Sequence, residues 1–514
     1  MQRWRQLSLR HPYFMALALG CILPLAYAPV NLLPIFYLSF ATVFYLAFVH
    51  RQSLKQLFLL GWLFGFGQFF TGLYWLGEAF LVDAETFLWL LPFAVTLLPA
   101  GLALFSGAAF ILFGLSFRAL NARFSRLPSL LWLALLWALA EYCRSVLLTG
   151  LPWNLPSMAW GSWLYLAQPA NVVGVHGLGL LALISAAVLV SRQNWARVSG
   201  VVLLVASFAY SAVVLNREAP PMDGEAVQVL IVQPNLDQGE KWQLDKRQAH
   251  IDKIFKITRS GLAAAPQTRI IIWPETAIPA LIDEGNWFGE ALRRQLKSQS
   301  TYLLTGAQRR QLEGGRTEFY NSAMLWRGDG RLIQRGDKHH LVPFGEYLPM
   351  QAWLESIGLQ QFTKLRGGYR AGPAAARFSQ DDLPTLAPLI CYEAIFPLLG
   401  AQHQRPAWLA NLTNDGWFGK SLGPHQHLAH VRLRAIEQGL PLIRSANTGV
   451  SAAFDARGQL LAALPLGQAG TLSVTLPPPL PAGLYAQIGD AGFFTLWLLL
   501  MSLMAVLSRW HRIK

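Results

Sequence analysis

Long apolar runs separated by short polar connections fill the first 216 residues, and one further run lies near the C-terminus. A helix that crosses a bilayer needs roughly 17–25 mostly apolar residues. Runs long enough to cross cover residues 12–29, 31–49, 57–80, 87–116, 128–148, 170–190, 198–216 and 484–508. The pattern therefore predicts eight transmembrane helices.

Between the seventh and eighth apolar runs, the pattern changes to short strands and amphipathic segments. Residues 227–235 and 269–273 have the continuous apolar character of buried strands, and residues 244–260 have helical periodicity. Repeated strand and helix units predict an α/β layer structure. We therefore expect three regions: a seven-helix transmembrane region at 1–216, a soluble domain at 217–480, and a final transmembrane helix with a tail at 481–514.

Basic residues mark alternate connections between the apolar runs, and such connections stay on the cytoplasmic side of a membrane. The connection at residues 78–85 is acidic. The basic connections contain Arg51 and Lys55, then Arg118, Arg123 and Arg126, then Arg192 and Arg197. The C-terminal tail is also basic, with Arg509, Arg512 and Lys514. We expect both termini in the cytoplasm and the 217–480 domain on the opposite side.

The N-terminus has one feature of a secretory signal peptide, because Arg3, Arg5 and Arg10 precede an apolar run. No convincing small-residue cleavage site follows, and a second apolar run begins at once. We therefore expect an uncleaved first transmembrane helix.

Composition limits the class of protein. A chain of 514 residues with 53% hydrophobic and 14% charged residues is too apolar for one ordinary soluble domain. Its net charge of +14 is compatible with nucleic-acid binding, but no basic module with interleaved aromatic residues occurs, and many arginines flank apolar runs. We expect no nucleic-acid partner and attribute the charge to membrane topology.

Three reactive side chains lie at the ends of apolar segments in the 217–480 region: Cys391, Glu275 and Lys338. A thiol, a carboxylate and an amine supply a nucleophile, a base and an electrophilic stabiliser. Cys391 by itself is equally compatible with a buried structural cysteine. Cys21 and Cys143 lie in apolar runs, so we expect no disulfide. An unpaired thiol in an oxidising compartment favours the nucleophile.

The motifs around these residues resemble those of the nitrilase superfamily over about residues 225–478. The motifs are Trp-Pro-Glu-Thr at 273–276, Asp-Lys-His-His-Leu-Val-Pro-Phe-Gly-Glu-Tyr at 337–347, Cys-Tyr-Glu at 391–393, and the segments 411–419 and 434–449. With its membrane spans, the whole chain resembles the apolipoprotein N-acyltransferase family. The resemblance implies an exported α-β-β-α sandwich, a Glu275-Lys338-Cys391 triad, and a catalytic domain on the periplasmic side of the bacterial inner membrane.

The resemblance also implies a reaction. Cys391 takes an acyl chain from a phospholipid as a thioester, and the α-amine of the diacylglyceryl-cysteine of an apolipoprotein accepts it. Glu275 is the expected base and Lys338 the expected oxyanion stabiliser. We expect membrane lipids around a monomer, no cofactor and no metal, since His425, His427 and His430 lack accompanying acidic or Cys ligands at a compelling spacing.

Several assignments stay open at this point. Supporting or substrate-binding roles are expected for five residues, each of which also suits ordinary packing: Glu346, Tyr392, Glu393, Trp242 and Trp417. The Trp-rich loop 150–163 is either a surface connector or a lipid-docking platform, and residues 350–365 are either a lid or helix core. The alternative functions are a membrane-tethered amidase that hydrolyses small C–N compounds, and a non-enzymatic scaffold or transporter.

Overall fold

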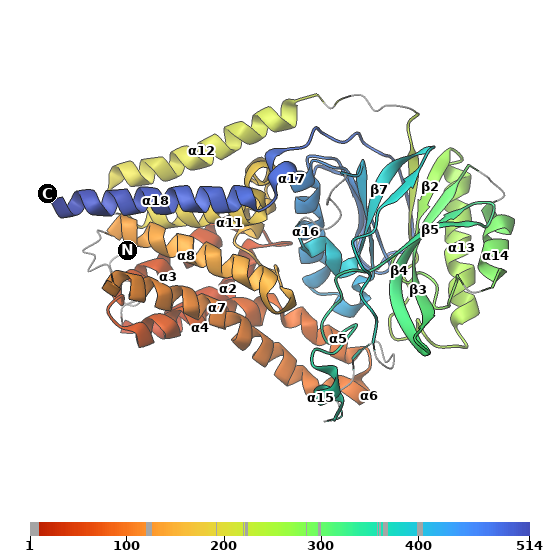
Figure 1. Ribbon diagram of the computed structural model, residues 1–514, viewed down its shortest axis with the longest axis horizontal. Helices are drawn as coiled ribbons and strands as arrows, with labels where there is room; N and C mark the ends of the chain where they lie inside the picture. The colour runs from red at the N-terminus through yellow and green to blue at the C-terminus, as the bar shows by residue number, and fades with distance from the viewer. Residues whose placement is uncertain are drawn as a thin grey trace. The chain divides into compact units, whose positions relative to one another are not determined.

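The computed structural model describes residues 10–119, 126–191, 193–218, 220, 225–283, 285–296, 300–356, 358, 361, 362, 368–397 and 405–513. The chain divides into two compact units, one helical and one built around sheets (Figure 1). The helical unit comprises Met1–Arg217, Ser421–Ala429 and Ala482–Lys514, and the sheet unit comprises Glu218–Lys420 and His430–Pro481. Arg3, Arg5, Arg123, Arg192 and Lys514, which entered the topology prediction, lie outside the described residues.

The helical unit consists of long apolar helices with short helical turns between them. Its elements are α2 Pro12–Ile22, η1 Leu23–Ala26, α3 Leu33–Val49, α4 Leu54–Gly72, η2 Tyr74–Gly77, α5 Glu78–Leu81, α6 Ala84–Phe87, η3 Leu88–Leu90, α7 Leu91–Ala119, α8 Arg126–Val146, η4 Leu147–Thr149, α9 Ser157–Gly161, α10 Leu164–Ala167, α11 Ala170–Leu189, α12 Asn194–Asn216, α17 Leu484–Ile488 and α18 Ala491–Ile513.

Length and composition identify the membrane-spanning candidates among the described residues. Four helices are long and apolar enough to cross a membrane, or five if the bent pair Leu54–Gly72 and Tyr74–Leu81 is one span. Three shorter apolar helices are Pro12–Ala26, Leu33–Val49 and Ala491–Met504. The structure therefore contains the apolar helices of a membrane protein.

Small residues and aromatic rings pack these helices together. A side chain on Gly20 of α2 would overlap the Phe64 carbonyl oxygen of α4, so glycine permits close backbone contact between the two helices. The Trp137 indole packs against the rings of Phe40, Phe64 and Phe110 at centroid distances of 5.3–5.7 Å. Aromatic rings from several helices thus fill the interior of the unit.

The Trp-rich loop at residues 150–163 differs from the sequence prediction. Trp153 and Trp160 are fully buried in the helical unit. The Trp153 indole N–H donates to Gln426 Oε1 at 2.7 Å, and that of Trp160 donates to the Tyr37 hydroxyl at 3.1 Å. The expected surface position of the loop is therefore wrong for these two residues, because burial of a large ring is favourable once its N–H has a partner. Trp163 is exposed.

The sheet unit contains twelve described strands and the helices that flank them. Its elements are β1 Gln228–Gln233, α13 Arg247–Ala264, β2 Thr268–Ile272, α14 Trp287–Leu296, β3 Tyr302–Glu313, β4 Arg316–Arg327, β5 Leu332–Asp337, α15 Gln351–Ser356, β6 Phe378–Gln380, β7 Leu383–Ile390, η5 Cys391–Ile395, β8 Trp408–Thr413, η6 Asp415–Phe418, α16 Gly423–Gln438, β9 Leu442–Ala446, β10 Ser451–Phe454, β11 Leu460–Leu464 and β12 Gly470–Thr475. The helix α16 begins in the part of the chain that belongs to the helical unit.

The strands form two six-stranded sheets, with the orders β12-β1-β2-β3-β4-β5 and β11-β10-β9-β8-β7-β6. The central strands β1, β2 and β3 of one sheet are parallel, as are β7, β8 and β9 of the other. Parallel neighbours place their C-terminal ends at the same edge of a sheet, where α/β proteins hold their functional groups.

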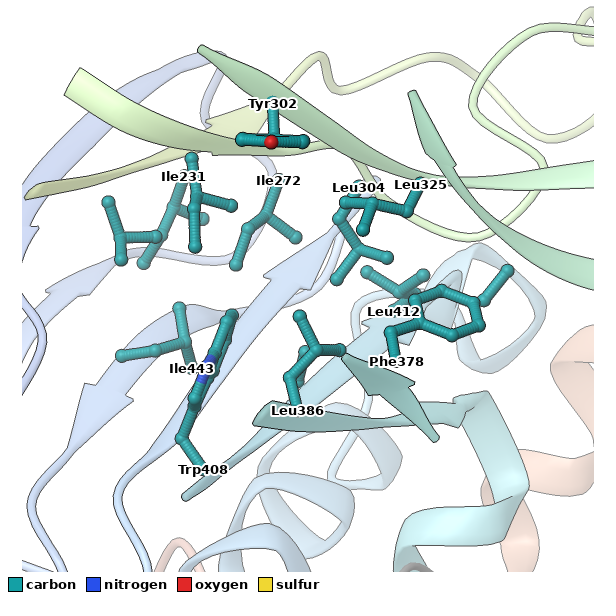
Figure 2. Close-up of a cluster of buried hydrophobic side chains, with 14 of the residues drawn as sticks. Ile231, Ile272, Tyr302, Leu304, Leu325, Phe378, Leu386, Trp408, Leu412 and Ile443 are labelled. Atoms are coloured by element: carbon teal, nitrogen blue, oxygen red, sulfur yellow. The ribbon is translucent and has the colours of Figure 1, made fainter. Parts of the chain in front are cut away.

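The two sheets share one apolar core. Figure 2 shows Ile231 and Ile272 of one sheet facing Leu386, Trp408 and Ile443 of the other. A second apolar cluster joins the opposite face of the first sheet to α13 and α14, for example through Ile271, Phe255 and Phe288. The unit is therefore a nitrilase-like layered sandwich, as the sequence predicted.

The described part of the 350–365 segment contains one short helix, α15 Gln351–Ser356. Residues 357, 359, 360 and 363–365 lie outside the described part of the chain. Trp353 is exposed, whereas Leu354 is buried. Because α15 has one side in the protein and one aromatic side chain in solvent, both the lid and the packing interpretations stay open for it.

The inter-sheet core makes a stability prediction. Trp408 is fully buried in that core, so Trp408→Ala should destabilise the sheet unit by about 3–5 kcal/mol. The measurement is thermal unfolding of the full chain in detergent. Leu312→Ala removes an exposed apolar side chain at the end of β3 and serves as the control, with an expected change within about 0.5 kcal/mol. Equal melting of both variants would contradict the assigned core.

Candidate functional site

The three predicted reactive residues follow the ends of three strands and are brought together there. Glu275 follows β2, Lys338 follows β5 and Cys391 follows β7. Their exposed fractions are 7%, 1% and 8%, respectively. Lys338 Nζ lies 3.7 Å from Glu275 Oε1, and both residues act electrostatically on Cys391. The fold therefore assembles a thiol, an amine and a carboxylate in one buried place.

Glu275 is held by the backbone of β3. The Gly306 amide donates to the Pro274 carbonyl at 3.1 Å, and the Ala277 amide donates to the Gly306 carbonyl at 3.0 Å. A Cβ on Gly306 would lie 2.5 Å from the Glu275 Cα, so only glycine lets the turn approach this closely. Thr276, with φ of 41°, adopts the left-handed conformation that β-branched residues rarely use. The turn therefore fixes the direction of the Glu275 side chain.

Lys338 lies among two carboxylates and an amide. Its Nζ donates to the Glu346 carboxylate at 3.0 Å. Asn321 Nδ2 donates to both carboxylates, at 2.7 Å to Glu275 Oε1 and at 2.9 Å to Glu346 Oε1. The ammonium and the amide N–H group together offset the repulsion between two buried carboxylates. Glu346 thus contacts Lys338 directly, in the arrangement expected of a residue that orients it.

Cys391 begins the short helix η5 in a left-handed conformation, with φ of 51°. Such a conformation is unfavourable for a residue with a side chain and is found at functional sites when the surrounding structure holds it. Strand pairing places Ile390 opposite Leu412, and the next residue on the partner strand, Thr413, hydrogen-bonds Cys391. The backbone of Cys391 is therefore held at the end of β7, and its thiol is held by a side chain of β8.

Glu393 stabilises the same turn through the backbone. One of its carboxylate oxygens accepts from the Ile390 amide at 2.7 Å, and the other accepts from the amides of His339 at 2.8 Å and His340 at 3.2 Å. A single carboxylate thus connects the segment of Cys391 to the segment of Lys338. These contacts support a positioning role for Glu393 rather than direct contact with the reacting atoms.

Burial dominates the protonation of the reactive groups. It raises the pKa of Cys391 to about 12, with a further rise from Glu275 and an opposing effect of Lys338. Burial also raises the pKa of Glu275, against the effect of Lys338. For Lys338 burial lowers the pKa, but Glu346 and Glu275 outweigh it and raise the pKa above its usual value. The site therefore contains a protonated thiol, a cation and a carboxylate whose basicity is increased by burial.

A polar network beneath the thiol was not predicted as part of the site. Asp415 is fully buried, forms an ion pair with Arg444 and accepts from the Thr413 hydroxyl at 3.1 Å. Arg444 also donates to the Asn411 side chain. Asn411, Thr413 and Asp415 lie in the 411–419 motif and Arg444 lies in the 434–449 motif, so both motifs carried a signal, but only the fold pairs Arg444 with Asp415.

Two further buried groups escaped sequence reasoning. Asn321 lies in the buried part of strand β4, between the aromatic pair Phe319-Tyr320 and the apolar run 323–326, and this polar interruption was the available signal. Lys241 is buried, and its ammonium reaches the Glu275–Thr276 turn. A lysine in a polar segment gives no indication of burial, so the sequence contained no signal for it.

The predicted aromatic residues have different environments. Trp242 is 44% exposed, whereas Trp417 is half-buried and lies 6.3 Å from the ring of Phe362. Tyr392 packs edge-to-face against Phe396 at 5.0 Å. Trp242 therefore has surface available to an apolar substrate, and the described contacts of Tyr392 are packing contacts with a neighbouring ring.

The charge arrangement predicts how Cys391 responds to loss of Lys338. Removing this cation takes away an effect that lowers the pKa of both Cys391 and Glu275, so both pKa values should rise. Iodoacetamide alkylation of Cys391 at pH 8 should then slow at least about tenfold in Lys338→Met, since each pKa unit changes the thiolate population tenfold. The measurement is intact-protein mass in a Cys21→Ala, Cys143→Ala background. Lys420→Met, an exposed lysine, is the control; an unchanged rate in Lys338→Met would contradict the arrangement.

Comparison with known proteins identifies the family. Residues 19–188 match the apolipoprotein N-acyltransferase N-terminal domain, and residues 228–480 match the carbon-nitrogen hydrolase domain. A solved amidase from Nesterenkonia sp. has 18% identity and a TM-score of 0.37, covering 54% of this chain and 98% of its own. The apolipoprotein N-acyltransferase of Rhodopseudomonas palustris is 40% identical over 96% of this chain and 95% of its own, and that of Bradyrhizobium diazoefficiens is 38% identical over 92% and 91%. The chain therefore belongs to the apolipoprotein N-acyltransferase family.

Proposed function

We propose that this protein transfers an acyl chain from a phospholipid to the α-amine of the N-terminal diacylglyceryl-cysteine of an apolipoprotein. The observation that carries the proposal is the buried Glu275-Lys338-Cys391 arrangement in a chain of the apolipoprotein N-acyltransferase family. The two substrates react in turn, because the thiol holds the acyl group between them. Such a reaction needs no redox step.

The first half-reaction forms the thioester. Glu275 accepts the thiol proton while Cys391 Sγ attacks an ester carbonyl carbon of the phospholipid. Lys338 stabilises the negative charge that develops on the carbonyl oxygen. The C–O bond of the ester then breaks, and Glu275 returns the proton to the departing lysophospholipid oxygen. The products are a lysophospholipid and an acyl thioester on Cys391.

The second half-reaction forms the amide. An α-amine ordinarily has a pKa of about 7.7–8.0, so a substantial fraction of the acceptor is neutral at physiological pH. Its nitrogen attacks the thioester carbonyl, Glu275 takes the proton that the nitrogen loses, and Lys338 again stabilises the oxyanion. The C–S bond breaks and the proton passes to the sulfur. Cys391 is thereby regenerated as a thiol.

Three neighbouring residues support this chemistry in the proposal. Glu346 orients the Lys338 ammonium, and Glu393 keeps the Lys338 and Cys391 segments together through backbone hydrogen bonds. Trp242 offers an exposed indole to the lipid. Trp417 and Tyr392 complete the proposed substrate-binding set.

The helical unit offers a place for an acyl chain. A cavity of about 530 Å³ lies between α4, η2, α5 and α7 and is lined mostly by apolar side chains. Its lining residues are Phe70, Thr71, Tyr74, Gly77, Glu78, Leu81, Leu91 and Val95. Mostly apolar cavities of roughly 300–1,000 Å³ with a few polar groups suit small lipid-like ligands. A hollow of this size and lining is wide and apolar enough for an acyl chain.

The proposed topology has eight spans and three regions, namely residues 1–216, 217–480 and 481–514. The four long apolar helices, the bent pair and the three shorter apolar helices support this number. The alternation of basic connections supports cytoplasmic termini and a periplasmic catalytic domain at the inner membrane. Both lipid substrates would then meet the site from the membrane in which they reside.

Reporter fusions test this topology. A reporter enzyme active only in the periplasm should be active when fused after Arg217 and inactive when fused after Lys514, because seven spans precede the first point and eight precede the second. A reporter active only in the cytoplasm is the matched control and should give the reverse result. Activity of one reporter at both points would contradict an eight-span topology.

Intact-protein mass tests the reaction. Incubation with phospholipid alone should add the mass of one acyl chain to the wild-type protein and nothing to Cys391→Ser, because a hydroxyl in this site lacks adequate activation. Addition of a diacylglyceryl-cysteine peptide should then remove the acyl chain from the enzyme and add it to the peptide. Cys143→Ser is the control and should behave as the wild type. An acyl chain on Cys391→Ser, or loss of the acyl group only to water, would refute the proposed transfer.

A further inference from the structure

Lys241 is a buried charged residue that the proposed reaction does not use. Its exposed fraction is 1%. Its Nζ donates to the Thr276 hydroxyl at 2.9 Å and to the Glu275 carbonyl oxygen at 3.3 Å. A buried ammonium loses its hydration and is kept only where partners replace the water. Here the partners belong to the turn that carries the proposed base.

That turn has two other fixed points and one unfavourable conformation. Hydrogen bonds of Pro274 and Ala277 attach its two ends to Gly306 of β3. Between them Thr276 adopts its left-handed conformation, which is unfavourable for a β-branched residue unless its surroundings hold it. Lys241 binds both the Thr276 side chain and the carbonyl that precedes it. The ammonium is therefore the third attachment of the turn, at its strained residue.

The charges around Lys241 give the ammonium a second effect. Burial lowers the pKa of Lys241 to about 8, and Glu275 and Cys391 oppose that shift. Lys241 in turn lowers the pKa of Glu275. Asp237 and Glu240 on its own segment are engaged elsewhere, since Asp237 accepts from backbone amides and Glu240 pairs with Lys246. The other charged groups of the site are Lys338, Glu346, Glu393 and Asp415.

We propose that Lys241 is a positioning residue for Glu275: its ammonium holds the Glu275–Thr276 turn and places a second buried cation beside Glu275. This inference rests on the proposed function, in which Glu275 is the base. Lys338 faces the Glu275 carboxylate, whereas Lys241 acts from the backbone side of the same residue. Loss of the Lys241 proton leaves a neutral amine that supports the carboxylate less.

The sign of the pH effect follows from these charges. Acylation of Cys391 needs Glu275 ionised, so its rate rises with pH through the Glu275 pKa. It should fall again above about pH 8, where Lys241 loses its proton and its hydrogen bonds to the Glu275–Thr276 turn lose the strength that the charge gives them. Removal of the Lys241 charge raises the pKa of Glu275, which shifts the acidic limb to higher pH. It also abolishes the fall near pH 8.

The test measures thioester formation from phospholipid against pH by intact-protein mass, in the full chain with Cys21→Ala and Cys143→Ala. Lys241→Met should react about 100-fold more slowly, since a small displacement of a catalytic group has that effect. In this variant the rise of the thioester-formation rate with pH should occur at higher pH than in the wild type. The decrease of that rate above about pH 8 should be absent. Lys241→Arg keeps the charge and should restore most of the rate, also without the fall near pH 8, because arginine stays protonated.

The control is Lys246→Met, a partly exposed lysine of the same segment, which should keep the wild-type rate and profile. The profile shape is measured within one variant, so it does not depend on how much protein folds. If the rate of Lys241→Met rises and falls at the same pH values as that of the wild type, the positioning role is wrong while the proposed function stands. If the wild-type protein forms no thioester at all, the proposed function fails, and this inference fails with it.

Discussion

Lys338 holds a fully buried ammonium between the carboxylates of Glu275 and Glu346, and the candidate site depends on that contact. Two carboxylates this close repel each other, and an ammonium without them would lose its hydration uncompensated. Each group is therefore stable in the interior only because the others are present. The Asn321 amide, which donates to both carboxylates, completes the arrangement. Charge balance, rather than any single hydrogen bond, keeps these groups out of water.

The two-sheet architecture makes that balance possible. Glu275 and Lys338 come from one sheet and Cys391 from the other, and the apolar core between the sheets keeps their strand ends together. Local backbone geometry then aims the side chains. Thr276 and Cys391 both adopt left-handed conformations. Because Gly306 has no side chain, the turn that carries Glu275 can lie directly against β3. The core thus supports unfavourable local conformations at the positions where chemistry needs them.

The burial that sets up these charges also suits acyl transfer. Burial raises the pKa of Cys391 to about 12, so the thiol is protonated at neutral pH, and in the proposed reaction Glu275 must take its proton at the moment of attack. Exclusion of water strengthens the contact of Lys338 with an oxyanion and slows hydrolysis of a thioester. A family that passes acyl chains between lipids gains from both effects, because the acyl-enzyme must survive until the acceptor arrives. Tight packing around the nucleophile is therefore part of the chemistry.

The sequence by itself determined the apolar runs, the layered α/β unit and the reactive Glu275, Lys338 and Cys391. Hydrophobic periodicity is a local property, and short motifs at strand ends keep their order along the chain. Only the tertiary structure decided which polar residues are buried. Trp153 and Trp160 have the composition of a surface loop but lie inside the helical unit, and Lys241 lies in a polar segment but reaches the turn of Glu275. Burial of a polar or amphipathic side chain depends on partners distant in sequence, such as Gln426 for Trp153 and Thr276 for Lys241. No local pattern encodes those partners, so the fold alone assigns them.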